Sequence, residues 1–236
     1  MERDRSEFFL IHLIAKLAVK INKTNEKLWL ILAETQVAND LYKQALNSLD
    51  QAENLNPNIS EIYFAKSNIY LKISQLKNAK TALETGLKIE PNNYKAIFQL
   101  GNIFLMEKNY SEAIKIFDKS TKIKPDFWQA INNQGLAYFE EDNQKLSIQF
   151  FEKALSIEEN AEPLLALASC LRIKDIKLAL QLTKKALAKD PNYVNYDYRK
   201  EQLWGEKLQT STEVLLQHKE LQQDVTLAKS KINGSS

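Results

Sequence analysis

Two kinds of side chain suited to peptide binding recur at a fixed spacing in this sequence. Asn68 and Asn102 are 34 residues apart, and so are Phe64 and Phe98. An asparagine amide both donates and accepts hydrogen bonds, so a series of such amides can hold the backbone of an extended peptide whatever its side chains are. The phenylalanines, one helical turn away, would add apolar pockets. The alternative is that these residues are ordinary solvated helix surface, since asparagine is abundant throughout the chain.

The residue types that carry catalysis or metal binding are sparse. Only two histidines occur, His12 and His218, near opposite ends of the chain, and Cys170 is the single cysteine. Metal sites need several such ligands in a group. No Gly-rich phosphate loop, G-x-S-x-G or H-E-x-x-H motif is present. We therefore expect a protein that is not an enzyme and that uses no metal and no cofactor.

Other conspicuous side chains are expected to be structural. Cys170 is interpreted as a small buried packing residue rather than a reactive thiol. The paired acids are expected to be solvated and the tryptophans to belong to the core: Glu140-Glu141 and Glu158-Glu159 for the acids, and Trp29, Trp128 and Trp204 for the tryptophans.

The composition fits a soluble helical protein. The 236 residues are 44% hydrophobic and 26% charged, with five glycines and five prolines, too few for a sheet-rich protein with many tight turns. The net charge of +2 does not indicate nucleic acid as a partner. The apolar run 8–15 is interrupted by His12 and followed by Lys16, whereas a membrane span needs about 20 apolar residues. We expect a cytoplasmic protein.

The stretch 94–127 shows which elements would position the repeated side chains. Ile97, Leu100 and Phe104 are three and four residues apart and therefore share one face of a helix. Gly101 has no side chain and would let a second helix approach closely.

The second helix of this stretch has its own markers. Ala113 is expected to meet Gly101, Phe117 to fill the seam one turn later, and Pro125 to end the unit, because proline cannot continue a helix interior. A spacing of 34 residues relates two series: Pro57, Pro91 and Pro125, and Ala45, Ala79 and Ala113.

This order of residues resembles the tetratricopeptide repeat, a 34-residue helix–turn–helix unit with the pattern W-x2-L-G-x2-Y…A-x3-F…P. The resemblance implies an all-α fold, a right-handed α-solenoid of about five such units with helical caps. The outer units depart further from the pattern, and in the second unit Lys66 replaces an aliphatic residue. The five units are expected at residues 26–59, 60–93, 94–127, 128–161 and 162–193.

Both ends are expected to be capped by helices. Residues 1–25 would form a half repeat, with a helix at 7–22 whose apolar face consists of Phe9, Leu13, Leu17 and Ile21. Either the chain starts halfway through a repeat or a segment precedes this sequence. Residues 194–236 would form a C-terminal capping helix and tail, with one long helix over about 199–216.

The resemblance also implies a concave groove, lined by the first helix of each unit, that binds a protein or peptide partner. The two-carboxylate clamp of some family members is not expected, because its slots hold asparagines but no cations. The slots hold no basic stripe for nucleic acid either, and we expect a monomer. The predicted peptide-binding residues are Phe64, Asn68, Lys95, Phe98, Gln99, Asn102, Met106, Gln129, Asn132 and Asn133.

A second hypothesis is a peripheral membrane adaptor. Arg3, Arg5, Lys16, Lys20 and Lys23 surround the apolar N-terminal helix, as in helices that lie on a membrane surface. Packing of that apolar face against the first repeat is the competing interpretation. The run 201–208, EQLWGEKL, resembles small repeat proteins of cyanobacteria and plastids, some of which help to assemble photosynthetic complexes, which would place the adaptor on an internal membrane such as the thylakoid.

Overall fold

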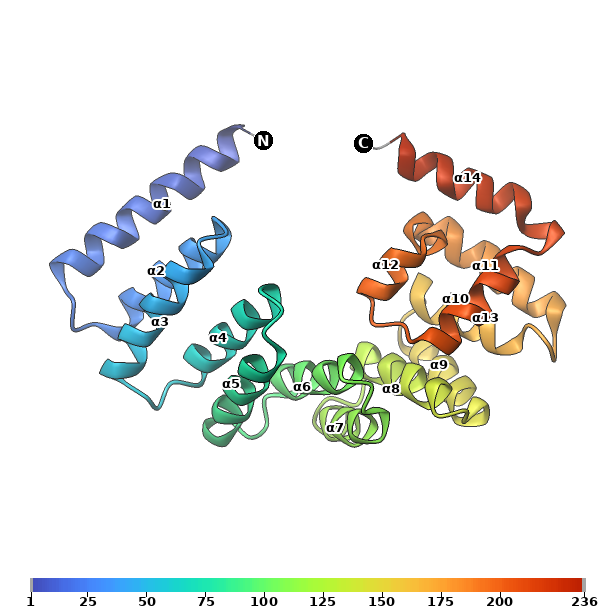
Figure 1. Cartoon of the computed structure of the whole chain (residues 1–236), viewed down its shortest axis with the longest axis horizontal. Coiled ribbons are helices and arrows are strands. Elements are labelled where there is room, and N and C mark those ends of the chain that lie inside the picture. The colour runs from blue at the N-terminus through green and yellow to red at the C-terminus, as the bar shows by residue number, and fades with distance from the viewer. Residues whose placement is uncertain (1, 235–236) are drawn as a thin grey trace. The chain divides into compact units, whose positions relative to one another are not determined.

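The computed structural model describes the backbone of residues 2–234 and the side chains from Leu10 onward within that range. Throughout this part of the chain the regular structure is helical (Figure 1). The helices are α1 (Glu2–Ile21), α2 (Glu26–Ala38), α3 (Tyr42–Leu55), α4 (Ser60–Lys72), α5 (Leu76–Ile89), α6 (Tyr94–Met106), α7 (Tyr110–Ile123), α8 (Trp128–Glu140), α9 (Gln144–Ile157), α10 (Ala161–Leu171), α11 (Ile176–Lys189), η1 (Pro191–Val194), α12 (Tyr196–Glu201), α13 (Glu206–Leu216), η2 (Lys219–Leu221) and α14 (Gln222–Asn233).

Consecutive helices form hairpins, in which α2 packs on α3, α4 on α5, α8 on α9 and α10 on α11. The turns α2–α3, α4–α5, α6–α7 and α8–α9 each hold one residue with a positive φ, close to 60°, a backbone conformation that residues other than glycine rarely adopt. These residues are Asp40, Ser74, Lys108 and Asp142, again 34 residues apart. The fold is the α-solenoid of helical repeats that the sequence predicts.

Glycines let the two helices of a hairpin approach closely. A Cβ atom on Gly101 would lie 2.4 Å from the Phe117 ring, and one on Gly135 would lie 2.6 Å from the Phe151 ring. The role predicted for Gly101 is therefore confirmed. Its nearest neighbour differs from the prediction, however, because the ring of Phe117 covers the glycine and not Ala113.

The chain divides into two compact units, one up to Ala96 and one from Ile97 onward, with the division inside α6. We call them the N-terminal unit and the C-terminal unit and describe each by itself.

The predicted N-terminal cap is wrong in detail. In α1, Ala15 and Val19 are the residues that pack on Leu32 of α2. Leu13, Leu17 and Ile21 were expected to form the packed face, but they are 43%, 49% and 87% exposed. The small side chains bring α1 close to α2 and turn the larger ones outward. Phe9, the fourth predicted member, has a side chain outside the described residues.

The departure at Lys66 has a local explanation. Its side chain is 11% exposed and forms ion pairs with Asp50, at 2.5 Å, and with Glu53, both on α3. Burial opposes the charge on Lys66, but the hydrogen bonds to the two carboxylates outweigh burial and raise the pKa of the ammonium group. The position therefore tolerates a cation because the neighbouring helix supplies two anions.

The predicted long helix over 199–216 is also wrong, because the helix is interrupted between the end of α12 at Glu201 and the start of α13 at Glu206. Leu203 has a φ of 66°, and the backbone N–H of Trp204 returns to the carbonyl of Arg199 at 3.1 Å. Gly205 then passes so close to α8 that a Cβ atom there would lie 2.2 Å from the Glu140 side chain. Helical periodicity continues across the break, which is why the sequence suggested a single helix.

Helix α13 crosses the turns of three successive hairpins, and we call it the α13 strap. Glu206 pairs with Lys108 of the α6–α7 turn at 2.8 Å, and Lys207 pairs with Asp142 of the α8–α9 turn at 2.6 Å. Ser211 accepts a hydrogen bond at 2.8 Å from Nε of Arg172, beside the α10–α11 turn. One helix thereby holds three repeats together.

Glu140 was expected to be solvated, but it is 7% exposed. Its carboxylate accepts the backbone N–H groups of Lys207 at 3.3 Å and Leu208 at 3.0 Å, at the start of the α13 strap. Burial raises the pKa of Glu140, and these two hydrogen bonds partly oppose that effect. The carboxylate caps the first turn of α13 from another part of the chain.

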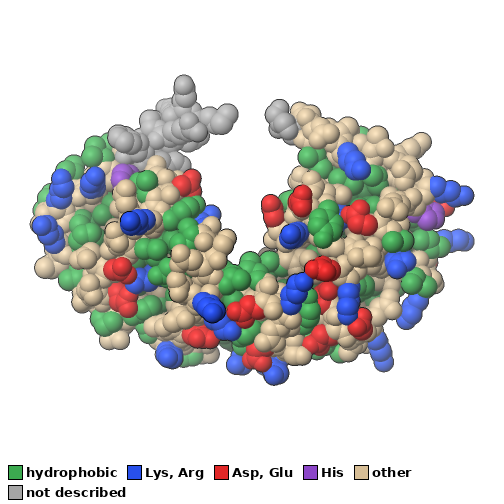
Figure 2. Space-filling view, in the orientation of Figure 1, with side chains coloured by type: hydrophobic (Ala, Val, Ile, Leu, Met, Phe, Trp, Pro, Cys, Tyr) green, Lys and Arg blue, Asp and Glu red, His purple; other side chains and the backbone are tan. Residues whose placement is uncertain are grey.

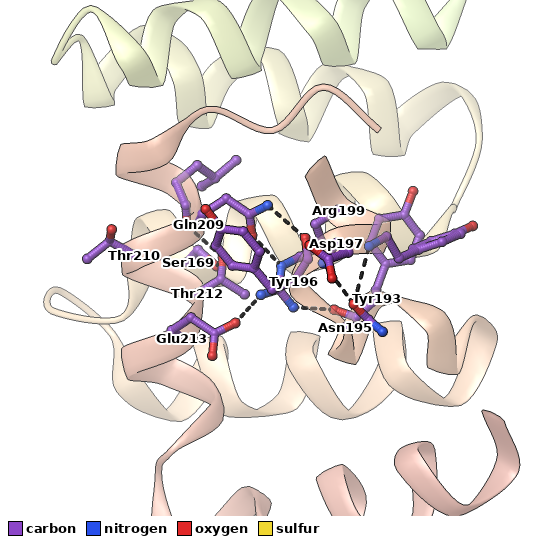
Figure 3. Close-up of polar contacts among 12 residues, drawn as sticks. Ser169, Tyr193, Asn195, Tyr196, Asp197, Arg199, Gln209, Thr210, Thr212 and Glu213 are labelled. Atoms are coloured by element: carbon purple, nitrogen blue, oxygen red, sulfur yellow. Dashed lines mark hydrogen bonds and ion pairs between the residues drawn. The ribbon is translucent and has the colours of Figure 1, made fainter. Parts of the chain in front are cut away.

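A buried arginine fixes α12 against α13 (Figure 3). Arg199 is completely buried, and its Nε donates to Oε1 of Gln209 at 2.8 Å. One of its terminal nitrogens donates to the carbonyl of Tyr193 at 2.6 Å, and the other pairs with Glu213. Helix α14 then packs on α11 and η1.

Candidate functional site: two cavities of different chemistry

The N-terminal unit contains a cavity of about 690 Å³ between α2 and α4, which we call the α2–α4 cavity. Leu30, Ala33 and Val37 line it from α2, and Phe64 and Asn68 line it from α4. The residues on α2 are three and four positions apart, so they form one stripe of the helix.

The α2–α4 cavity has an apolar floor and a mixed polar rim. Lys27 and Glu34 border it on α2, and Glu61 and Asn68 border it on α4. All four rim side chains belong to residues that are exposed to solvent. A cavity with apolar walls and a few polar groups at its edge fits the apolar side chains of a larger molecule.

The C-terminal unit contains a cavity of about 460 Å³, which we call the C-terminal cavity. The first helices of three hairpins contribute to it, with Phe98 on α6, Trp128 on α8 and Glu162 on α10. The segment from Asp190 to Leu203 folds back and supplies the remaining wall. Phe98 is held in place by the rings of its neighbours, as its centroid lies 5.6 Å from that of Phe117 and 4.9 Å from that of Phe127.

Carboxyl groups dominate the electrostatics of the C-terminal cavity. Glu162 is 9% exposed and accepts a hydrogen bond at 3.1 Å from the indole nitrogen of Trp204. Burial raises the pKa of the Glu162 carboxyl to about 7, although interactions with Trp204, Asn132 and Tyr193 act in the opposite direction. Tyr198 donates its hydroxyl to Asp190 at 3.0 Å. Burial and that bond raise the pKa of Tyr198 to about 12.

The two cavities together contain six of the ten predicted peptide-binding residues. Phe64 and Asn68 line the α2–α4 cavity, and Phe98, Asn102, Gln129 and Asn133 line the C-terminal cavity.

The other four predicted residues lie elsewhere. Asn132 is completely buried. Lys95 and Met106 are exposed outside these two cavities, and Gln99 is half-buried on α6. Asn132 therefore supports the site from behind rather than facing a partner.

The amides of the C-terminal cavity are linked to one another. Asn133 donates to Oδ1 of Asn102 at 2.8 Å, and Asn132 donates to Oδ1 of Asn133 at 3.2 Å. The first bond joins α8 to α6, so these amides also hold adjacent repeats in register.

Several residues of the two cavities were not predicted. The stripe Leu30, Glu34 and Val37 has helical spacing and could have been found from the sequence. Trp128 was expected in the core, but it is half-buried and lines the C-terminal cavity. Trp204, by contrast, is 4% exposed, as predicted. The contribution of Asp190–Leu203 depends on a chain reversal that no spacing indicates.

Cys170 takes no part in either cavity. It is 1% exposed, and burial raises the pKa of its thiol to about 12. The interpretation as a packing residue is confirmed, since reactivity requires the thiolate.

Comparison with known proteins agrees with the helical repeat. Two family models, both described as tetratricopeptide repeat, match residues 71–132 and 129–160. The chain is a tetratricopeptide-repeat protein. A search among curated proteins finds no significant match to the sequence.

Several solved structures are similar to this chain. A crystal structure of MamA is 25% identical, with a TM-score of 0.60 over 67% of this chain and 86% of that one. YrrB, described as "a TPR protein with an unusual peptide-binding site", is 20% identical, with a TM-score of 0.57 over 77% of this chain and 86% of that one. PilW, described as a "widely conserved type IV pilus biogenesis factor", is 17% identical, with a TM-score of 0.59 over 84% and 97%. The last two show the fold alone.

Proposed function

We propose that this protein is a non-enzymatic interaction scaffold or assembly factor. It binds a peptide or helix of a partner protein against the first helices of its repeats. The observation that carries the proposal is the α2–α4 cavity, whose apolar floor and polar rim lie on the first helices of two adjacent repeats. Peptide binding by YrrB is an analogous use of the same fold.

The α2–α4 cavity fits one face of an amphipathic helix or alternate side chains of an extended peptide. Leu30 and Val37 are about two turns apart on α2, so they offer apolar contact along the helix axis. The amide of Asn68 stands at the rim, where it can exchange hydrogen bonds with a peptide backbone. This combination is the one expected for helix-in-groove or extended-peptide recognition.

Selection from a random peptide library on the immobilised full-length chain tests the proposal. Peptides selected by the wild type should bind Leu30→Asp at least tenfold more weakly, because a carboxylate would replace an apolar contact in the cavity. Ile89→Asp is the matched control, since Ile89 is a 38% exposed apolar residue of α5 in the same unit. Equal binding by the wild type and Leu30→Asp would overturn the proposal, as would the absence of any enriched peptide.

One observation favours a second function, peripheral attachment to a membrane. Leu10, Leu13, Ile14, Leu17 and Ile21 are each at least 43% exposed and lie on one side of α1. Figure 2 shows hydrophobic side chains beside basic ones on this edge of the N-terminal unit. The competing interpretation, that the first repeat covers the apolar face, is wrong for Leu13, Leu17 and Ile21, although Ala15 and Val19 of α1 do pack on Leu32 of that repeat.

Charge is consistent with this second function. Lys16, Lys20 and Lys23 accompany the exposed stripe, and residues 10–25 contain no aspartate or glutamate. Such a helix suits an anionic lipid surface. The side chains of Arg3 and Arg5, which belong to the same hypothesis, lie outside the described residues. Among the described residues, no helix is long and apolar enough to cross a bilayer.

Flotation with liposomes containing phosphatidylserine tests membrane attachment. The double variant Leu13→Asp/Leu17→Asp should remain at the bottom of the gradient while the wild type floats. The control is Ile173→Asp, which places the same charge at a 75% exposed apolar residue of the C-terminal unit. If the wild type does not float, membrane attachment is contradicted and the proposal of a cytoplasmic interaction scaffold stands alone.

The role in photosynthetic assembly depends only on the run 201–208. In the structure two of its residues act in the cap: Trp204 bonds to Glu162, and Gly205 passes close to Glu140. These contacts account for the distinctive residues of the run without a photosynthetic partner.

A further inference from the structure

The C-terminal cavity differs from an ordinary peptide groove in the charge of its lining. Its charged members are Glu162, Asp190 and Glu201, and none of its lining residues is a lysine or arginine. The α2–α4 cavity, by comparison, has Lys27 beside its two glutamates. We infer that the C-terminal cavity receives a lysine or arginine side chain of the bound partner.

The depth of Glu162 is the first argument. This carboxyl is nine-tenths buried, yet it lines the cavity, and the groups that contact it are neutral: the Trp204 indole, the Asn132 amide and the Tyr193 hydroxyl. A buried carboxylate without a cation is costly, and a cation that reaches it recovers much of that cost. Among the described residues, no lysine or arginine lines this cavity.

An unpaired acceptor beside Glu162 is the second argument. Oδ1 of Asn132 is buried and has no hydrogen-bond partner among the described residues. Native proteins leave few such atoms unpaired, and each one requires an explanation. Asn132 does not line the cavity, so its Oδ1 shows only that the polar groups behind Glu162 are short of N–H donors; an ammonium or guanidinium group would supply such donors to Glu162 from the cavity side.

The walls of the cavity are the third argument. The rings of Phe98, Trp128 and Tyr198 line it together with the amides of Asn102 and Gln129. Aromatic faces attract cations and also cover the aliphatic stem of lysine or the plane of a guanidinium group. A purely acidic surface would lack this apolar enclosure.

The position of the acids is the fourth argument. Glu162 is buried, whereas Glu201 on α12 is exposed to solvent. Asp190 lies between them in exposure and accepts the Tyr198 hydroxyl. A cationic side chain would meet a negative charge on entering the cavity and another at the end of its path.

The inference rests on the proposed function, since it names the chemistry of the partner residue. Small probes nevertheless allow a test that is independent of peptide binding. Nα-acetyl-arginine amide and Nα-acetyl-lysine amide carry the cation, and Nα-acetyl-citrulline amide is the neutral isostere of the arginine probe. Each is titrated into the full-length protein, and NMR follows the side-chain amides of Asn102 and Asn133 and the indole of Trp128.

The cationic probes should give saturable shifts at these three residues, with a Kd about tenfold lower than that of the citrulline probe, as expected for one charge-assisted hydrogen bond. Glu162→Gln should weaken binding of the arginine probe about tenfold. Glu201→Gln should weaken it about twofold, because the Glu201 carboxylate is exposed to solvent. Glu158→Gln, at an exposed acid outside the cavity, should leave its affinity unchanged. Glu201→Gln keeps the test valid if Glu162→Gln fails to fold.

Equal affinity for the arginine and citrulline probes would overturn the inference, and so would the absence of saturable shifts. The peptide selection separates this failure from failure of the proposed function. If peptides are selected but are not enriched in lysine or arginine, the peptide-binding function stands and the inference of a bound cationic side chain is contradicted. If the cationic probes bind but no peptide is selected, the C-terminal cavity binds cations as inferred and the peptide-binding function is contradicted.

Discussion

The α2–α4 cavity and the C-terminal cavity use the same repeat positions and have different chemistry. Phe64 and Asn68 line the first, and Phe98 and Asn102, 34 residues later, line the second. The first cavity is mainly apolar. The second is aromatic, amide-rich and acidic, because Asp190–Leu203 folds back onto it. The comparison shows that repeat positions supply part of the lining of each cavity, and that a non-repeated segment gives the second cavity its different chemistry.

The largest expected effect comes from removing the anchor of that non-repeated segment. Arg199→Ala should lower the free energy of unfolding of the C-terminal unit by about 3–5 kcal/mol, because Gln209 and the Tyr193 carbonyl lose a buried partner. Urea unfolding followed by circular dichroism measures it. Lys200→Ala, at the exposed neighbouring residue of α12, should change stability by less than about 0.5 kcal/mol. Similar losses in the two variants would mean that Arg199 does not fix this wall.

The second prediction concerns pH and Glu162. Its pKa is about 7 in the folded protein against an ordinary 4.5, so the folded state binds the extra proton between these values. The contribution to stability is fully present below pH 4.5 and is lost as the pH rises through 7. The loss is roughly 3 kcal/mol by pH 8.

Comparison of unfolding at pH 5 and pH 8 in the wild type and in Glu162→Gln isolates this contribution, because the other titrating groups are common to both. The variant should lose less stability than the wild type over this range. Equal pH dependence would show that Glu162 is not held in a desolvated environment.

A third prediction compares two close glycine–phenylalanine contacts, one in each unit. A Cβ atom on Gly135 would lie 2.6 Å from Phe151, which is completely buried and has no space to move into. A Cβ atom on Gly86 would lie 2.5 Å from Phe64, which lines the α2–α4 cavity and can rotate into it.

Gly135→Ala should therefore destabilise the protein by about 2 kcal/mol, whereas Gly86→Ala should stay within about 1 kcal/mol of the wild type. Thermal and urea unfolding of the two variants check this difference. If Gly86→Ala were the more destabilising, Phe64 would be a fixed core residue and not an adjustable wall.

The smallest expected effect is at Lys66. Lys66→Met should change stability by less than about 1 kcal/mol, because an apolar side chain of similar length replaces a cation whose pairing mainly offsets its burial. Lys66→Ala, which also removes the packing of the side chain, should cost more. A large loss in Lys66→Met alone would show that the ion pairs stabilise the N-terminal unit.

The periodic part of the molecule could be predicted from the sequence, and the non-periodic part could not. The spacing of Gly101 and Phe117 predicted a close helix pair. The same contact between the two helices of a hairpin recurs in the next repeat, so it leaves a periodic pattern in the sequence. The cap at α1 was misjudged since small residues, Ala15 and Val19, took the buried face from larger ones. The chain reversal at Leu203 and the burial of Glu140 depend on contacts between segments about 65 residues apart, such as Lys207 with Asp142. No local pattern contains such contacts.

The candidate site divides in the same way. Phe98 and Asn102 were found because they recur 34 residues after Phe64 and Asn68, whereas Glu162, Asp190 and Tyr198 do not recur and were missed. The positive-φ residues of the turns recur in space but could not be predicted from the sequence. Asp40, Ser74 and Lys108 share a backbone conformation without sharing a residue type.

The α13 strap fixes the number of repeats at this end of the molecule. Its anchors Lys108, Asp142 and Arg172 lie at three successive turns, so the duplication or loss of a hairpin between them would move at least one anchor away from α13. Repeat arrays otherwise change length readily, because each unit contacts only its neighbours. Insertion or deletion of a hairpin between α6 and α11 is therefore expected to disrupt the contacts of α13, whereas the same change before α6 would leave them in place.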